Sequence, residues 1–376
     1  MKLTPLRLGM LALTLLLAVG LSSARRDDQP PELYLEMPGR VASEEPFDLF
    51  LSANEPVTYL VEYGDLELER VSQDLTVSLL ALSGEHDVEV SASDAAGNEA
   101  SATLRVTGVP PVVATLEVPD AAMAGDPVTI TARWEGEAAV EEAVLQFAAA
   151  PGTTLERSNA LIRVAAIPLG STAGEWPVEL TLVDEFGRVS TSSAQLRIAA
   201  STQPVQELNI SPTTLSVITP AGRELEREAF AAAYAQPLPT PQWSSPFLMP
   251  IEGLSTSGFG LPRRYAPGGP VSYHEGADIG APAGTPIHAT NDGIVRVADF
   301  YPIKGGLTLI DHGAGVSSLY FHQSTILVES GDRVSRGQVI GEVGTTGLST
   351  GPHLHWEMRV ARTPTNPLAW VDRIWP

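Results

Sequence analysis

The chain contains no cysteine among its 376 residues. Disulfide bonds, zinc–thiolate sites and lipid attachment to an N-terminal cysteine are therefore excluded. Basic residues are also scarce, since 23 Lys and Arg stand against 45 Asp and Glu, and the formal net charge is −22. Such an acidic chain argues against nucleic acid as a partner and against electrostatic docking on anionic membranes. With 43% hydrophobic residues, the composition is that of a globular protein held together by its apolar cores.

The negative charge is concentrated in the first two thirds of the chain. Residues 246–376 contain 9 Lys/Arg and 11 Asp/Glu, a balance of −2, which leaves −20 for residues 1–245. We interpret this acidic part as a soluble surface that repels other copies of itself, and we expect a monomer.

The apolar run at the N-terminus is short. Residues 8–21 form a mostly apolar stretch of 14 residues, whereas a membrane-spanning helix needs about 20. Lys2 and Arg7 precede this run and Ser22-Ser23-Ala24 follows it, an order that is typical of an export signal. Residues 1–24 are predicted to be a signal peptide that is either cleaved or retained as an N-terminal membrane anchor. Both alternatives place the rest of the chain in the cell envelope, in the periplasm or at the cell surface, or in the medium as a secreted protein.

An internal repeat with an offset of 90 residues follows. The segment Asp94-Ala95-Ala96-Gly97-Asn98 recurs as Asp184-Glu185-Phe186-Gly187-Arg188, and alternating runs flank both copies. An alternating strand, an Asp-x-x-Gly turn and a second alternating strand predict a β-hairpin. Two units at about 30–108 and 112–199 are therefore predicted to be tandem β-sandwiches, which resemble bacterial immunoglobulin-like domains. Neither has a recognisable site, so we interpret them as spacers or placement modules.

Residues 200–245 are predicted to be a linker. Helix-forming residues, with Leu225, Phe230 and Tyr234 able to share a stripe, predict a helix over about 222–235. Three prolines between residues 237 and 241 predict a stiff hinge after it. The linker is either a plain spacer or a segment that packs on a neighbouring domain and limits access to its site. The second alternative leads to the hypothesis that the N-terminal part covers a substrate groove until it is moved.

Residues 246–376 are predicted to form an antiparallel, all-β domain. Short alternating runs are interrupted by glycine turns, and no segment in this part has a helical pattern. The fold class predicted for the whole chain is thus all-β, with two sandwiches, one linker helix and a C-terminal β-domain.

Histidines are few, and most of them lie in this last part. Of the chain's 7 histidines, His353 and His355 lie two residues apart. Side chains alternate along a strand, so these two should point the same way, about 6–7 Å apart. One imidazole can then bind a metal while its neighbour handles a proton. His274 and Asp278 would complete a set of two histidines and one carboxylate, which suits a catalytic zinc with an open position.

A series of ordered motifs surrounds these residues. It comprises residues 257–260, His274-x-Gly276-x-Asp278, 281–286, Asp292-Gly293, Asp311-His312-Gly313, Tyr320-x-His322, 341–347 and 349–357. In these motifs, residues 247–376 resemble the lysostaphin/LytM-type zinc endopeptidases, which cut peptide cross-links in bacterial peptidoglycan. The resemblance implies that zinc is the cofactor and that peptidoglycan cross-links are the substrate.

The resemblance also implies roles for individual residues. It makes His274, Asp278 and His355 the zinc ligands, and His322 and His353 an unliganded catalytic pair. In this assignment His353 is the general base and His322 donates to the oxyanion or orients the water, although either histidine can be the base on sequence grounds. Glu357 follows on the same strand face, where it is either a partner of a ligand histidine or a polar residue in a groove.

Three functions follow from this reading. The first is an active zinc endopeptidase that remodels or lyses peptidoglycan. The second is a non-catalytic envelope protein that binds or activates other wall hydrolases. The third is an envelope structural protein whose sandwiches do the main work. Because all three ligands and both catalytic histidines are present, the sequence favours the enzyme.

Overall fold

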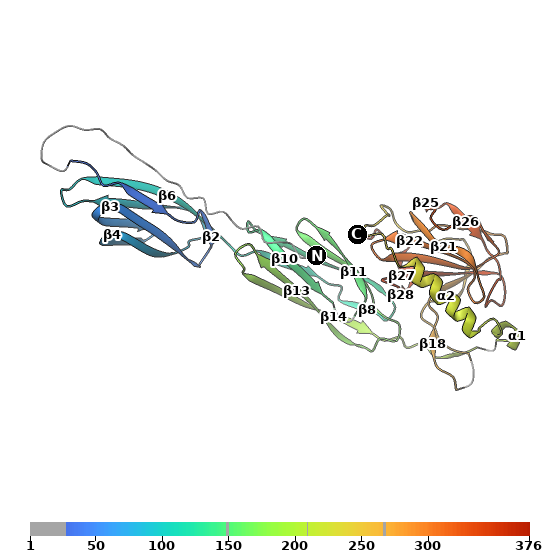
Figure 1. Cartoon of the computed structure of the whole chain (residues 1–376). Coiled ribbons are helices and arrows are strands. Elements are labelled where there is room, and N and C mark those ends of the chain that lie inside the picture. The colour runs from blue at the N-terminus through green and yellow to red at the C-terminus, as the bar shows by residue number, and fades with distance from the viewer. Residues whose placement is uncertain (1–27, 148–149, 209, 266–267) are drawn as a thin grey trace. The chain divides into compact units, whose positions relative to one another are not determined.

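A computed structural model of the chain describes residues 28–147, 150–208, 210–265 and 268–376 (Figure 1). The predicted signal segment at 1–24 lies outside the described residues. The chain is nearly all β, which confirms the predicted fold class. Within the described ranges, no helix is both long enough and apolar enough to cross a membrane.

The chain divides into two compact units. The first contains the described residues up to Val113 together with Glu135–Ala143 and Leu182–Ser190. The second contains Ala114–Trp134, Val144–Thr181 and Thr191–Pro376. The boundaries of the two sandwiches stay a prediction.

The first unit is built on a six-stranded sheet in the order β1-β3-β5-β6-β2, with β4 also paired to β3. Alternate residues of the long strand β3, such as Leu49, Tyr59 and Val61, are fully buried in its core. The strands are β1 (Leu33–Glu36), β2 (Arg40–Ala42), β3 (Pro46–Tyr63), β4 (Leu66–Leu80), β5 (Gly84–Ser93) and β6 (Glu99–Val109).

The two turns of the predicted repeat have the same structure. Asp94 Oδ1 accepts the N–H groups two and four residues later, both at 2.8 Å, and Asp184 Oδ1 does the same at 3.0 Å. Gly97 and Gly187 have φ values of 86° and 77°, which a residue with a Cβ rarely adopts. The Asp-x-x-Gly pattern therefore predicted these turns correctly.

The strands of residues 113–199 form two four-stranded sheets, in the orders β10-β13-β14-β8 and β11-β12-β9-β7. They are β7 (Val113–Glu117), β8 (Ala121–Met123), β9 (Pro127–Glu135), β10 (Val140–Gln146), β11 (Gly152–Arg157), β12 (Ala160–Ala166), β13 (Gly174–Asp184) and β14 (Val189–Ala199).

The C-terminal part contains the largest sheet, which has eight strands in the order β16-β19-β27-β23-β22-β21-β25, with β28 paired to β27. A three-stranded sheet β20-β26-β24 and a small sheet β15-β17-β18 complete it. The core around Trp356 and Trp370 also includes Leu155 and Val164 of β11 and β12. The strands are β15 (Gln206–Glu207), β16 (Leu254–Ser257), β17 (Pro262–Arg264), β18 (Ser272–Tyr273), β19 (Ala277–Gly280), β20 (Pro286–His288), β21 (Gly293–Tyr301), β22 (Gly305–Gly313), β23 (Val316–Gln323), β24 (Thr325–Ile326), β25 (Arg333–Val334), β26 (Val339–Glu342), β27 (His353–Val360) and β28 (Thr363–Thr365).

Among the residues that the structure describes, helices are confined to three elements. The linker contains α1 (Pro212–Leu215) and α2 (Pro220–Ala233), and a 3₁₀ turn, η1 (Pro367–Trp370), lies near the C-terminus. Helix α2 begins two residues before its predicted start because Thr219 is its N-cap and accepts the N–H of Gly222 at 2.9 Å, while Pro220 occupies the first turn. The turn η1 was not expected in this part of the chain.

The linker is not a plain spacer. Helix α2, yellow in Figure 1, packs on the large sheet, with Ala233 buried beside Leu307 and Leu319. The proline-rich segment after it is bound along β22, since Leu238 N donates to Asp311 Oδ2 at 3.1 Å and Gln242 N donates to the carbonyl of residue 312 at 2.8 Å. These bonds hold the segment on the sheet, so the prediction of a stiff hinge at this segment is wrong.

Candidate metal centre

Three of the predicted site residues lie together, two of them on neighbouring strands of the large sheet. His274 directly follows β18, Asp278 lies on β19, and His355 lies on β27. Strands β19 and β27 are antiparallel, and their register places Asp278 opposite His355. The potential ligand atoms of the three side chains all lie within 4.8 Å of one another.

The three nearest atoms form a small triangle. Asp278 Oδ1 lies 3.0 Å from His274 Nε2 and 2.8 Å from His355 Nδ1, and the two nitrogens lie 3.0 Å apart. Ligands at about 2.0–2.1 Å from a tetrahedral zinc stand roughly 3.3 Å from each other. The triangle is therefore close to the size that one ion requires.

In both imidazoles, one ring nitrogen points away from the triangle. The hydrogen-bond partner of this outer nitrogen determines which nitrogen of the ring carries the proton. His274 Nδ1 lies 2.7 Å from the carbonyl oxygen of Gly258, and His355 Nε2 lies 3.1 Å from Glu357 Oε1. Both partners only accept hydrogen bonds, so these outer nitrogens carry the protons. The inner nitrogens then point lone pairs at each other and at the Asp278 carboxylate. Three acceptors this close repel one another unless a cation lies between them, so the residues fit a metal ion.

The pKa values of these three residues also indicate a site for a cation. Burial alone would raise the pKa of Asp278, but its contacts with His274 and His355 hold it well below its usual range. Burial lowers the pKa of His274. Burial would also lower the pKa of His355, but Asp278 and Glu357 together raise it. Without a cation the centre therefore favours a proton on His355, and a bound metal would replace that proton.

The predicted catalytic pair lies beside the triangle. The ring centroids of His322 and His353 are 4.8 Å apart, and His353 Nε2 lies 3.8 Å from Asp278 Oδ1. His322 Nδ1 lies 2.8 Å from the carbonyl oxygen of Thr346, and His353 Nδ1 lies 2.8 Å from that of Gly351. In each ring, Nδ1 donates its proton to a carbonyl and Nε2 is left as an acceptor.

His322 has an unusual backbone conformation and a strongly lowered pKa. Its backbone φ is 63°, in a region that residues with a Cβ seldom occupy and that costs about 1–3 kcal/mol. Burial, helped by the nearby His355 and His353, lowers the pKa of His322 to about 3. The ring is therefore neutral at pH 7, and its Nε2 is available as a hydrogen-bond acceptor.

Glu357 contacts His355, a candidate metal ligand. Its side chain is fully buried and accepts from His355 Nε2 at 3.1 Å and from Arg359 Nε at 2.7 Å. Arg359 Nη2 in turn donates to Glu275 Oε2 at 2.7 Å. Of the two alternatives for Glu357, the contacts favour a partner of a ligand histidine over a polar residue in a groove. Arg359 was missed, although strand alternation places it on the same face as Glu357.

Arg263 and Gly276 also lie next to the candidate ligands. Arg263 Nη2 lies 3.5 Å from Asp278 Oδ2, a neighbour that the sequence did not reveal. A Cβ on Gly276 would lie 2.5 Å from the carbonyl oxygen of Trp356 and 2.7 Å from His355 Nε2, so the glycine of the His-x-Gly-x-Asp motif leaves room for both the strand β27 and the imidazole.

Fold and site together define the C-terminal part as an all-β domain with a two-histidine, one-carboxylate centre, the arrangement of a metallopeptidase. Residues 272–367 match the model of Peptidase family M23, and this part of the chain is an M23 domain. All five predicted site residues lie inside the matched range.

Similar proteins match over the same part. The peptidoglycan DD-endopeptidase ShyA of Vibrio cholerae serotype O1 is 44% identical over 98 residues, which cover 26% of this chain and 23% of that protein. The DD-carboxypeptidase/endopeptidase Mpg of Neisseria meningitidis serogroup B is 44% identical over 96 residues, 26% of this chain and 22% of that protein. The catalytic domain of lysostaphin from Staphylococcus simulans is a structural neighbour with 31% identity and a TM-score of 0.28, covering 31% of this chain and 90% of that domain. The chain thus spans about a quarter of the length of these two curated relatives.

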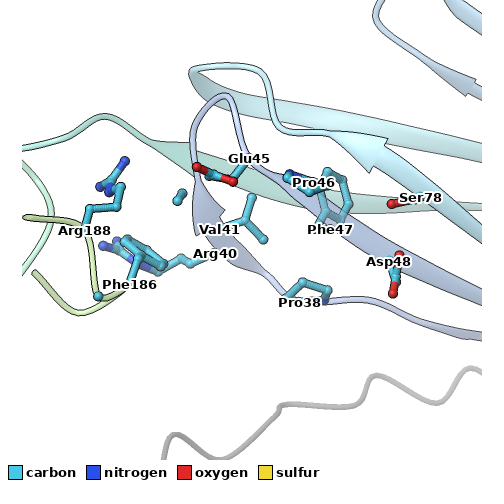
Figure 2. A pocket seen from close by; sticks show the side chains of 12 residues that line it. Pro38, Arg40, Val41, Glu45, Pro46, Phe47, Asp48, Ser78, Phe186 and Arg188 are labelled. Carbon is cyan, nitrogen blue, oxygen red and sulfur yellow. The ribbon is translucent and has the colours of Figure 1, made fainter.

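A hollow of about 940 Å³ lies in the first unit (Figure 2). Both of its arginines are paired: Arg40 with Glu185 at 2.9 Å, and Arg188 with Asp184 at 2.8 Å. None of the described residues that line it is a histidine. We assign no chemistry to this hollow.

Proposed function

We propose that the protein is a zinc-dependent endopeptidase that hydrolyses peptide cross-links of bacterial peptidoglycan. The observation that carries the proposal is the convergence of His274, Asp278 and His355 on one point with His322 and His353 beside it. The names of the relatives that share residues 272–367 support peptidoglycan as the substrate.

In this proposal His274 Nε2, Asp278 Oδ1 and His355 Nδ1 hold the zinc. Three protein ligands leave one position open, as catalytic zinc sites require. When bound, zinc supplies Lewis acidity that polarises a peptide carbonyl and lowers the pKa of water. Glu357 keeps the proton of His355 on Nε2, so that Nδ1 stays directed at the metal.

The two remaining histidines handle the protons. His353 Nε2 is the nitrogen of that ring nearest the centre, so it accepts the proton of the attacking water and passes it to the leaving amine. His322 is neutral and presents an acceptor at Nε2, so it orients the water. Donation to the oxyanion, the other role considered for His322, would require a second proton on that ring.

The remaining expectations concern the whole chain. We propose an exported protein of the cell envelope, with peptidoglycan as its partner and no nucleic acid. The state of the N-terminal segment, cleaved or retained as an anchor, and the monomeric state stay predictions.

The test is digestion of purified peptidoglycan, followed by mass spectrometry of the released muropeptides. The wild-type protein with zinc should convert cross-linked dimers into monomers. A chelator should stop the reaction, and added zinc should restore it. His353→Ala should reduce the rate by about 10²–10⁴-fold, while His86→Ala, in the first unit, should not change it.

Equal rates for wild type and His353→Ala would overturn the proposal. Cleavage that releases only terminal residues from uncross-linked stem peptides would replace endopeptidase by carboxypeptidase activity. Binding to peptidoglycan without any cleavage would favour the non-catalytic alternative.

A further inference from the structure

Helix α2 carries a buried carboxylate outside the M23 domain. Glu226 is 6% exposed, and only Gly222 and Ala233 are also buried on this helix. Its Oε1 accepts the backbone N–H groups of Ile303 at 2.8 Å and Lys304 at 2.9 Å. These two residues belong to the turn between β21 and β22. A buried carboxylate is unfavourable unless it is hydrogen-bonded, so this contact calls for an explanation beyond packing.

The turn that Glu226 holds is attached directly to the candidate catalytic histidine. The carbonyl of Lys304 accepts the backbone N–H of His322 at 2.9 Å, and the carbonyl of Ile303 accepts that of Leu348 at 2.8 Å. Residues 346–348 in turn hold the His322 ring, because the carbonyl of Thr346 lies 2.8 Å from its Nδ1. Lys304 thus donates its backbone N–H to Glu226 and accepts the backbone N–H of His322 on its carbonyl.

The strained backbone of His322 makes this attachment necessary. A residue with a Cβ stays at a φ of 63° only where its surroundings hold it there. The N–H bond to Lys304 and the ring bond to Thr346 are two of the contacts that do so. Glu226 binds the Lys304 N–H directly, and the segment of Thr346 is hydrogen-bonded to Ile303, the other residue that Glu226 binds.

Phe230 of α2 makes two further contacts with residues that lie beside the candidate metal centre. Phe230 packs against the cluster that contains Phe321, and the Phe321 ring stacks on the His355 ring with centroids 4.9 Å apart. The guanidinium of Arg359, which binds Glu357, lies 5.9 Å from the Phe230 ring centroid. Helix α2 therefore contacts residues that pack against His355, a candidate ligand, and residues that hydrogen-bond to His322, a candidate catalytic residue.

We propose that Glu226 is a positioning residue for His322, and that α2 is a structural part of the peptidase site rather than a linker. The role in catalysis rests on the proposed function above. The role in holding His322 does not, and it can be measured separately.

The experiment compares three variants of the full chain. Glu226→Ala should lower kcat by about 10–100-fold, because a small displacement of a catalytic group has that effect. KM and the bound zinc per chain should stay near their wild-type values, since the candidate ligands lie on other segments. Glu226→Gln keeps an acceptor oxygen and should recover most of the activity. Glu228→Ala, an exposed glutamate on the same helix, should match the wild type.

A double-mutant cycle separates positioning from general destabilisation. If Glu226 acts through His322, then Glu226→Ala should have little further effect on kcat once His322 is alanine. An equal loss of kcat with and without His322 would overturn the proposal.

Hydrogen exchange gives a readout that does not depend on activity. Glu226→Ala should speed exchange of the His322 and Leu348 amides, and leave the β20-β26-β24 sheet unchanged. Unchanged exchange at His322 would also overturn the proposal. An inactive wild type with faster His322 exchange in Glu226→Ala would instead count against the proposed function and leave the positioning role in place.

Discussion

Replacing Glu357 with glutamine should weaken metal binding without removing a ligand. The carboxylate accepts from His355 Nε2 at 3.1 Å and lies 2.6 Å from Arg359 Nη2, in a fully buried position. Burial alone would raise the pKa of Glu357, but Arg359 and the His355 hydrogen bond hold it well below its usual range, so the group is ionised at neutral pH. The charge is therefore part of what fixes the proton on His355 Nε2.

The size of the effect follows from these contacts. Loss of the carboxylate beside a ligand histidine lowers metal affinity by about 10–100-fold, which corresponds to about 1–3 kcal/mol. The same change leaves Arg359, 15% exposed, without its most buried charged partner. Breaking a buried ion pair costs about 3–5 kcal/mol, so the metal-free variant should also unfold more easily.

Two measurements check the prediction. Zinc affinity is obtained by competition with a chromophoric chelator, and the free energy of unfolding is obtained by urea denaturation of the metal-free protein. Glu275→Gln is the matched control, since Glu275 binds the same arginine but is 48% exposed. It should cost less than about 1 kcal/mol and leave zinc affinity unchanged. A zinc affinity of Glu357→Gln within about twofold of wild type, well outside the range above, would refute the reasoning.

Three further predictions concern the same part of the chain. Gly276→Ala should lower zinc affinity with all three candidate ligands present, because its Cβ would lie 2.5 Å from the Trp356 carbonyl oxygen and 2.7 Å from His355 Nε2; wild-type affinity in a titration would contradict this. Burial lowers the pKa of His312 to about 4, so its contribution to stability is complete above about pH 6.5 and falls by about 3 kcal/mol as the pH drops to 4. His312→Gln should flatten the pH dependence of unfolding in that range, and an unchanged slope would count against the assignment. Trp370→Ala should cost about 3–5 kcal/mol in urea unfolding, since the ring is fully buried and stacks on Trp375 at 4.1 Å; a loss under about 1 kcal/mol would show that this core is not tightly packed.

Much of the fold could be predicted because the signals are local. The Asp-x-x-Gly pattern predicted both turns, since the aspartate oxygen binds two nearby N–H groups and the glycine takes a positive φ. The start of α2 was missed by two residues because Thr219 and Pro220 lie before the apolar stripe that was used to predict it. The bound state of the proline-rich segment could not be predicted, since its partners lie on β22, about 70 residues later in the chain.

The residue types and spacings of the candidate site were determined by the sequence itself. Strand alternation already placed His353, His355 and Glu357 on one face, because that periodicity is a property of the backbone. Only the tertiary structure decided which ring nitrogens face the centre, how β19 pairs with β27, and that Glu226 holds the turn beside His322. Those features depend on contacts between segments distant in sequence, whose register and packing are set by the whole core and not by any local pattern.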